Sequence, residues 1–173
     1  MKVQKLTVLS MLTALYVVFT IMTPVKLINF KFTLEAFPIL VAGMLLDKWD
    51  GLIVGLLGSA IYQVLFSSYG ITPTTPLWIL PHAVSGLLVG LWAHKVKDLD
   101  YRNIFLIAVV SAFVVTTLNT FALYVDSRLY GYYSSKLVFG TLVIKYGTGA
   151  VLAVVFALIL VKLIPQLRKI LKG

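Results

Sequence analysis

Lys145 is the side chain in this sequence whose position most demands a partner. It follows Lys136 by nine positions, which at about 1.5 Å per helical residue places it roughly 13 Å into an apolar segment, near the middle of a bilayer. An ammonium group in hydrocarbon is costly and needs a counter-charge. That partner could be a substrate anion, Glu35 or backbone carbonyls; alternatively, the segment starts late and the ammonium reaches a surface. We expect Lys145 to face a ligand or a cavity.

Two amides and a histidine also lie within apolar stretches. Asn119 and Gln63 each stand near one end of such a stretch, where a side-chain amide suits either an interhelical or a ligand hydrogen bond. Trp78 and His82 follow a proline-rich loop, and irregular backbone at membrane depth is tolerated only where protein or a cavity covers it. We expect both to face an internal site, with an interfacial tryptophan and a helix-packing histidine as the open alternatives.

Cations and aromatic residues suggest the class of ligand. Five cations would suit a ligand that bears a carboxylate: Lys26, Lys31, Arg128, Lys136 and Lys145. Five tyrosines fall near one boundary of the apolar segments and would suit stacking on a flat heteroaromatic ring, together with Trp78: Tyr62, Tyr124, Tyr130, Tyr132 and Tyr133. The candidate substrate-binding set is Lys26, Lys31, Glu35, Gln63, Trp78, His82, Asn119, Tyr124 and Lys145.

Catalytic and metal chemistry find no support in the sequence. There are no cysteines, and the two histidines, His82 and His94, are separated in the chain, which argues against a metal cluster. No Walker A sequence, acyl-transfer elbow or pair of membrane carboxylates occurs. We therefore expect neither an enzyme nor a cofactor bound by this chain.

The composition identifies the elements that must position these residues. Hydrophobic residues make up 60% of the chain and charged residues 12%, against about 25% charged in a soluble domain, and the mean hydropathy is +0.99. Six apolar segments lie between polar, proline and glycine residues: 6–23, 34–46, 52–67, 77–93, 103–125 and 136–164. The sequence predicts an all-α membrane protein, a compact bundle of six transmembrane helices forming a single domain over residues 1–173.

The distribution of basic residues predicts the orientation of the bundle. With Met1 inside, ten lysines and arginines fall on the inner side and four on the outer side, as the positive-inside rule requires. Both termini are therefore expected to be cytoplasmic. The expected location is a cell membrane, of the bacterial plasma-membrane type, which the chain crosses several times. The net charge of +9 then records topology, and nucleic acid is not an expected partner.

The connections on the two sides differ, and one end of the first segment carries a packing motif. The outer connections 24–33, 67–76 and 126–135 are longer than the inner ones and mix aromatics, prolines and cations. The functional site is therefore expected to open to the outside. We expect residues 69–75 to act as a lid over a bound ligand. At the inner end, Ser10 and Ala14 form a small-xxx-small pair that lets another helix approach closely.

Taken in order, these patterns resemble the substrate-binding S components of energy-coupling factor (ECF) vitamin transporters, over essentially the whole chain. The opening Lys5-Leu6-Thr7 runs into the stretch 10–15, and the block 32–46 reads Phe-Thr-Leu-Glu-Ala-Phe-Pro-Ile-Leu-Val-Ala-Gly-Met-Leu-Leu. Gly51, Gly55, the proline loop into 77–90 and Leu118-Asn119-Thr120 follow. The second block and the Asn-Thr pair look most like the folate-type branch.

The resemblance implies a vitamin-binding subunit that joins a transmembrane coupling protein and two ABC ATPases, which use ATP. It implies that Ser10 and Ala14 occupy the Ala-xxx-Ala positions that dock on the coupling protein, and that the ligand is buried beneath the loops 24–33 and 67–76. One departure is Asp47-Lys48-Trp49-Asp50-Gly51, where a Gly-Pro usually follows the second helix.

The expected function is high-affinity vitamin binding for an ECF-type ABC importer, with folate first. Other micronutrients remain open as substrates, namely pantothenate, cobalamin or a pyrimidine precursor. A different class, an autonomous small-molecule channel or facilitator, is disfavoured because the chain shows no internal repeat and no ring of pore-lining groups.

Overall fold

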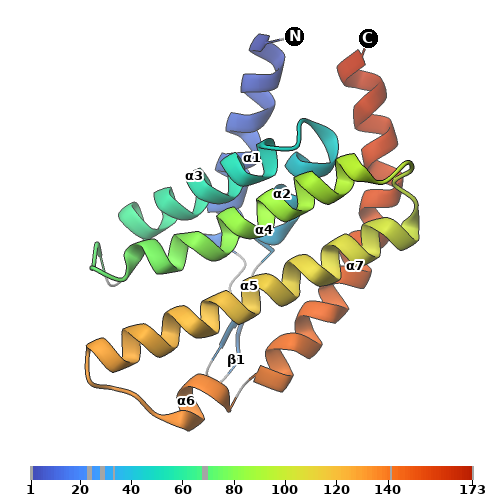
Figure 1. Cartoon of the computed structure of the whole chain (residues 1–173). Coiled ribbons are helices and arrows are strands. Elements are labelled where there is room, and N and C mark those ends of the chain that lie inside the picture. The colour runs from blue at the N-terminus through green and yellow to red at the C-terminus, as the bar shows by residue number, and fades with distance from the viewer. Residues whose placement is uncertain are drawn as a thin grey trace.

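The computed structural model describes residues 2–22, 25–27, 30–32, 34–67, 70–140 and 142–172. The elements in chain order are α1 (Lys2–Met22), β1 (Val25–Leu27), β2 (Phe30–Phe32), α2 (Ala36–Leu45), α3 (Asp50–Leu65), α4 (Thr75–Lys95), α5 (Tyr101–Leu129), α6 (Ser135–Phe139) and α7 (Leu142–Lys172). The expected helical membrane fold is confirmed, and both termini lie at the same end of the bundle (Figure 1).

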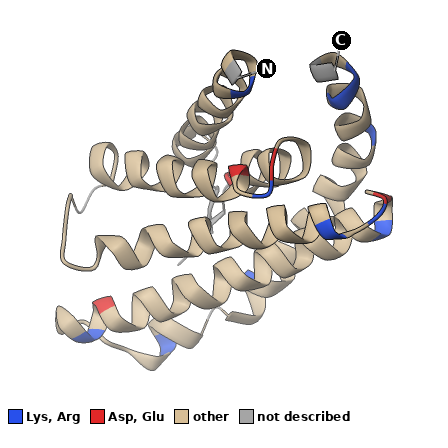
Figure 2. Cartoon of the chain, turned by 45° about the horizontal axis from the view of Figure 1, so that its top comes forward, with Lys and Arg blue, Asp and Glu red and all other residues tan. Residues whose placement is uncertain are grey.

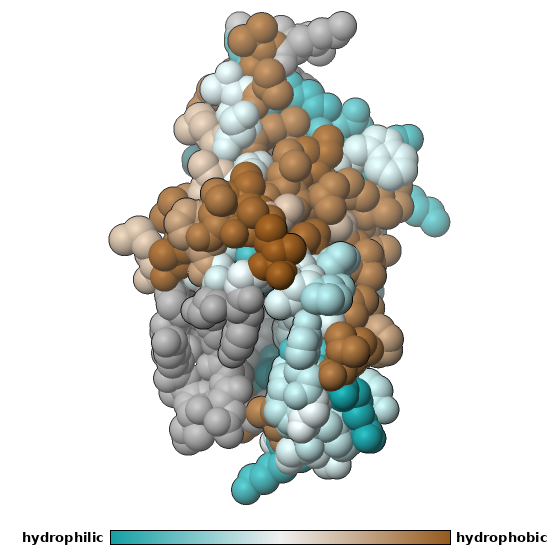
Figure 3. Space-filling view, turned by 90° about the vertical axis from the view of Figure 1, so that its left-hand side faces the viewer, coloured by the Kyte–Doolittle hydropathy of each residue, from teal (hydrophilic) through white to brown (hydrophobic). Residues whose placement is uncertain are grey.

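Four of the helical stretches are long and apolar enough to cross a membrane: Val3–Met22, Thr75–Lys95, Tyr101–Leu129 and Ser135–Ile170. The second and third segments form the shorter apolar helices Ala36–Leu45 and Asp50–Leu65. On the face shown in Figure 3, apolar side chains cover much of the surface and more hydrophilic ones gather toward its lower part. Such a surface suits lipid around the bundle.

Two local features depart from the six simple helices expected. The first outer connection contains a short antiparallel hairpin, in which Lys26 and Lys31 are opposite each other in the register. The last segment forms two helices, since α6 ends at Phe139 and α7 begins at Leu142, with residue 141 outside the described residues. The short helix α6 therefore precedes the long final helix at the end of the bundle opposite the termini (Figure 1).

Glycines let α2, α3 and α4 pack with their backbones in contact. A Cβ atom on Gly86 would lie 2.0 Å from the carbonyl oxygen of Gly51, and one on Gly55 would lie 2.2 Å from the carbonyl oxygen of His82. A Cβ on Gly90 would lie 2.1 Å from the carbonyl oxygen of Lys48. On α2, a Cβ atom on Gly43 would lie 3.0 Å from the backbone nitrogen of Gly90. The glycines therefore fix how the three helices sit together. We call this contact the glycine seam.

Charged groups tie the elements together near the termini. The Lys5 ammonium lies 2.9 Å from a carboxylate oxygen of the buried Asp50 and 3.7 Å from one of Asp47. A hydrogen bond from the backbone N–H of Lys48 lowers the pKa of the Asp47 carboxyl. On α7, Arg168 donates to the carbonyl oxygen of Met44 at 3.0 Å. Figure 2 shows basic residues at both chain ends and at the α4–α5 connection; the cytoplasmic orientation of this end stays a prediction.

A second polar cluster lies at the opposite end of the bundle, around Asp126 near the end of α5. The hydroxyls of Thr74 and Tyr132 donate to its two carboxylate oxygens. Thr74 and Thr75 are buried, and the backbone N–H of Thr72 donates to the Thr75 hydroxyl at 2.8 Å. The last part of the loop expected to act as a lid is therefore tied to α5.

Candidate functional site

A cavity of about 550 Å³ opens among helices α1, α2, α3, α4, α5 and α7. Its volume falls within the range of about 300–1,000 Å³ that small-molecule sites occupy. Its wall combines apolar side chains with aromatic, hydroxyl, amide and charged ones, the last four kinds being Tyr16, Thr20, Glu35, Ser59, Tyr62, Gln63, Trp78, His82, Thr116, Asn119, Lys145 and Thr148.

The cavity brings together most of the side chains singled out in the sequence. Six of the nine candidates line it: Glu35, Gln63, Trp78, His82, Asn119 and Lys145. They come from the start of α2 and from α3, α4, α5 and α7. Residues more than a hundred positions apart therefore face one space, and their roles toward a ligand remain predictions.

The other three candidates lie elsewhere. Tyr124 is not part of the cavity wall: its ring lies 5.6 Å from that of Tyr133 and 5.5 Å from the Arg128 guanidinium. The reason is helical register, because Leu123 lines the cavity and the next residue points about 100° away. Lys26 and Lys31 lie in the hairpin strands, and their side chains are outside the described part of the structure.

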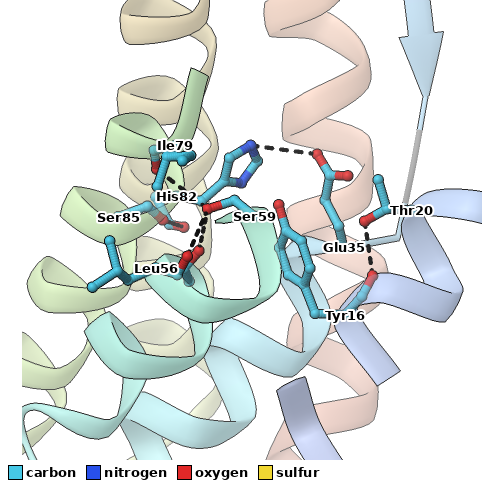
Figure 4. A network of polar contacts seen from close by, with 10 residues as sticks. Tyr16, Thr20, Glu35, Leu56, Ser59, Ile79, His82 and Ser85 are labelled. Atoms are coloured by element: carbon cyan, nitrogen blue, oxygen red, sulfur yellow. Dashed lines mark hydrogen bonds and ion pairs between the residues drawn. The ribbon is translucent and has the colours of Figure 1, made fainter. Parts of the chain in front are cut away.

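Glu35 and His82 approach each other at one side of the cavity. The Nε2 atom of His82 lies 3.7 Å from Oε1 of Glu35, which is longer than a normal hydrogen bond. The ring of Tyr16 meets the imidazole edge-on, with 5.5 Å between centroids and an angle of 81°. Figure 4 shows the three side chains converging from different helices. Glu35 is thus paired with His82 rather than with Lys145.

Lys145 lies in the first turn of α7, as the fourth residue of that helix. The segment forms two helices, α6 and α7, with residue 141 outside the described part, and the depth expected for Lys145 stays a prediction. Lys145 lines the cavity. Among the residues that the structure describes, Lys145 has no ion-pair partner. A cation in such a place favours an anion supplied by a ligand.

Sequence reasoning missed the contribution of α1 to the cavity. Tyr16 and Thr20 both line it, and only 1% of Tyr16 is exposed. The Tyr16 ring occupies space that is free because Gly58 has no side chain: a Cβ atom on Gly58 would lie 2.5 Å from the ring. A tyrosine and a threonine four positions apart in an apolar helix share one face, and this spacing was the available signal.

The other face of α1 is free of the bundle. Ser10 and Ala14, the predicted docking residues, are both exposed, whereas Tyr16 and Thr20 point inward. The helix therefore contacts the cavity on one side and offers small side chains on the other.

The described residues form no cluster of side chains that could bind a metal ion. Within the described ranges, no group of three or more histidine, cysteine, aspartate or glutamate side chains lies close enough to hold an ion. The polar groups of the cavity wall are instead spread over separate helices as hydrogen-bond donors and acceptors.

Comparison with known proteins identifies the fold and the family. A crystal structure of FolT bound with folic acid superposes with a TM-score of 0.64 at 17% sequence identity, covering 91% of this chain and 93% of that one. No curated protein sequence gives a significant match. The family model for the "ECF-type riboflavin transporter, S component" matches residues 1–166. S components are transporter subunits and not enzymes. The chain belongs to the family of ECF-type riboflavin transporter S components.

Proposed function

We propose that this chain captures a vitamin with a flat heteroaromatic ring and a carboxylate, folate first, and delivers it as the S component of an ECF importer. The observation that carries the proposal is Lys145, a cation in the wall of a membrane cavity with no ion-pair partner among the described residues. A carboxylate on the ligand would supply the missing counter-charge.

The ring of the ligand has aromatic neighbours in the same wall. Trp78, Tyr62 and Tyr16 come from three different helices, and aromatic side chains favour offset or edge-on contacts with a flat ring. Asn119 and Gln63 add amide groups that can donate and accept hydrogen bonds. These groups suit a heteroaromatic ligand with polar edges.

The two comparisons carry the names of different vitamins. The family model is named for riboflavin, and the similar structure holds folic acid. Riboflavin has no ionised group at neutral pH and would leave Lys145 without a counter-charge, whereas the glutamate tail of folate carries two carboxylates. The ammonium of Lys145, unpaired among the described residues, therefore favours folate, and at 17% identity this choice rests on that side chain rather than on the likeness.

The proposed partners are a transmembrane coupling protein, docked against Ser10 and Ala14, and two ABC ATPases that use ATP. The small exposed side chains on α1 leave room for a helix of the coupling protein. We place them on the cytoplasmic side, together with both termini, in the plasma membrane.

Mass spectrometry of the small molecule that co-purifies with the detergent-solubilised chain tests the ligand. We expect a folate. A neutral flavin as the only bound compound would contradict the proposed ligand class. Transport of the vitamin into liposomes by the chain alone would contradict its role as a subunit and favour a channel.

Assembly is tested by the Ala14→Trp variant, whose indole would fill the docking surface. We expect the variant to bind the vitamin normally and to lose co-purification with the coupling protein and ATPases. Val151→Trp, which adds the same ring at an exposed site on α7, is the control and should still assemble. Normal assembly of Ala14→Trp would place the docking surface elsewhere.

A further inference from the structure

We propose that Glu35 selects the ligand by accepting two adjacent N–H groups from the edge of its ring. On this basis the side chain at position 35 decides between a pterin-type and a flavin-type edge. The inference rests on the proposed function, since it assigns one end of the same ligand.

The position of Glu35 leaves its carboxylate available to a ligand. It directly precedes the first residue of α2, yet its side chain makes no capping hydrogen bond to that helix. The Glu35 side chain is 19% exposed and belongs to the cavity wall. The positive end of the α2 dipole favours a negative charge there, and an acidic group inside a membrane protein is costly enough to suggest a specific use.

His82 restrains the carboxylate without saturating it. The contact of 3.7 Å involves Oε1, and in the part of the chain that the structure describes, Oε2 has no hydrogen bond or ion pair. The histidine is itself held, because its side chain is only 10% exposed, Tyr16 packs against its ring, and its backbone touches Gly55 in the glycine seam. A carboxylate with two oxygens beside a fixed histidine can accept hydrogen bonds from donors that approach from the cavity (Figure 4).

The two candidate rings differ in the donors they present. A 2-amino-4-oxo pterin offers its N3–H and its amino group side by side, which match the two oxygens of a carboxylate. An isoalloxazine offers one N–H between two carbonyl groups, so a carboxylate would meet one donor and an opposing acceptor. A side-chain amide, with one acceptor and one donor, matches the flavin edge better.

The two ends of the ligand would then face two sides of the cavity. The ring edge lies at Glu35 and His82, near α2 and α4, and the carboxylates lie at Lys145 on α7. Glu35 and Lys145 do not form an ion pair, so each is available to its own part of the ligand.

The test is a titration of the purified full-length chain and its Glu35→Gln variant with folate and with riboflavin. We expect the variant to bind folate about 100-fold more weakly and to lose none of its affinity for riboflavin, because one charge-assisted acceptor becomes a donor. Asp100→Asn is the matched control: this residue caps α5 outside the cavity through Asn103, and asparagine caps equally well. It should leave both affinities unchanged.

A second arm uses the wild-type protein and so does not depend on folding of a variant. A folate analogue in which a methyl group replaces the 2-amino group should bind about 30-fold more weakly than folate. Unchanged binding of this analogue, or an unchanged folate-to-riboflavin ratio in Glu35→Gln, would overturn the role of Glu35 and leave the proposed function intact. Failure of the wild type to bind folate at all would overturn the proposed function itself.

Discussion

The two sides of the bundle are built in opposite ways. Where α2, α3 and α4 meet, glycines bring backbone against backbone and leave no space for a Cβ atom. Where α5 and α7 meet, the helices enclose part of the cavity and border a second hollow of about 90 Å³. The close side holds His82 in place, and the open side leaves room for a ligand.

On the open side, only a thin wall separates the cavity from the smaller hollow. Ala112, Thr116 and Gly149 line both the cavity and the smaller hollow. Beyond them, Tyr146 stacks on Phe113 at 4.4 Å between ring centroids and shares a 2.9 Å hydrogen bond with Thr117. A single layer of small side chains therefore separates the two spaces, whereas no space remains within the glycine seam.

The largest effect is expected from filling the glycine seam with Gly86→Leu. The new Cβ would lie 2.0 Å from a backbone oxygen that cannot move alone, so we expect a loss of about 4 kcal/mol or more in the free energy of unfolding. Thermal unfolding in detergent measures it. The matched control is Gly147→Ala on α7, where nothing lies within 4 Å of the added Cβ. Alanine is the better helix former by about 1 kcal/mol, so equal damage from both changes would remove the contrast between the two sides.

Next in size is the effect of Lys145→Met on binding. The change removes the ammonium and keeps most of the side-chain length, so folding should be retained and stability should not fall. Folate affinity should drop by about 2–3 kcal/mol, the contribution of a charge-assisted contact, and most of the drop should appear as faster release. Stopped-flow release and equilibrium titration measure both. If folate binds this variant as it binds the wild type, Lys145 is not the anion site.

A smaller effect is expected at the mouth of the bundle from Asp126→Asn. The carboxylate accepts from Thr74 and Tyr132 through separate oxygens, and an amide has only one oxygen to offer. Loss of one tether of about 1 kcal/mol should speed ligand release about fivefold without changing the ligand preferred. Release rates identical to those of the wild type would mean that this loop plays no part in closing the site.

The smallest effect is expected from Tyr146→Phe, which removes one hydrogen bond to Thr117 and keeps the stacking on Phe113. Stability should fall by about 0.5–1 kcal/mol, as thermal unfolding would show, and ligand affinity should not change. A marked loss of affinity would show that the wall between α5 and α7 takes part in binding.

The sequence predicts the helices well because hydrophobic length is a local property. In the described part of the chain each of the six apolar segments contains helix, including the short second one, where Asp47 and Asp50 border the turn. The hairpin was missed because strands of three residues leave too little alternation to detect.

The candidate site could be predicted only in part, because its geometry depends on contacts between distant residues. Isolated polar residues in apolar segments pointed to Glu35, His82 and Lys145, and all three line the cavity. Which of them pair could not be derived, since Glu35 and His82 are brought together by the packing of α2 against α4. The sequence placed Tyr124 only to within a turn, and a shift of one residue rotates a side chain away from the cavity wall; its role toward a ligand stays a prediction.

The most direct test of the central claim, an anionic vitamin in this cavity, is a titration of the wild-type chain followed by tryptophan fluorescence, to which Trp78 in the cavity wall contributes. The ligands are folate, 6-methylpterin, which keeps the ring and lacks the carboxylates, and riboflavin. We expect folate to bind at least about 30-fold more tightly than 6-methylpterin, as a charge-assisted contact requires, and riboflavin to bind more weakly than folate. Equal binding of folate and 6-methylpterin, or tight binding of riboflavin alone, would contradict the account.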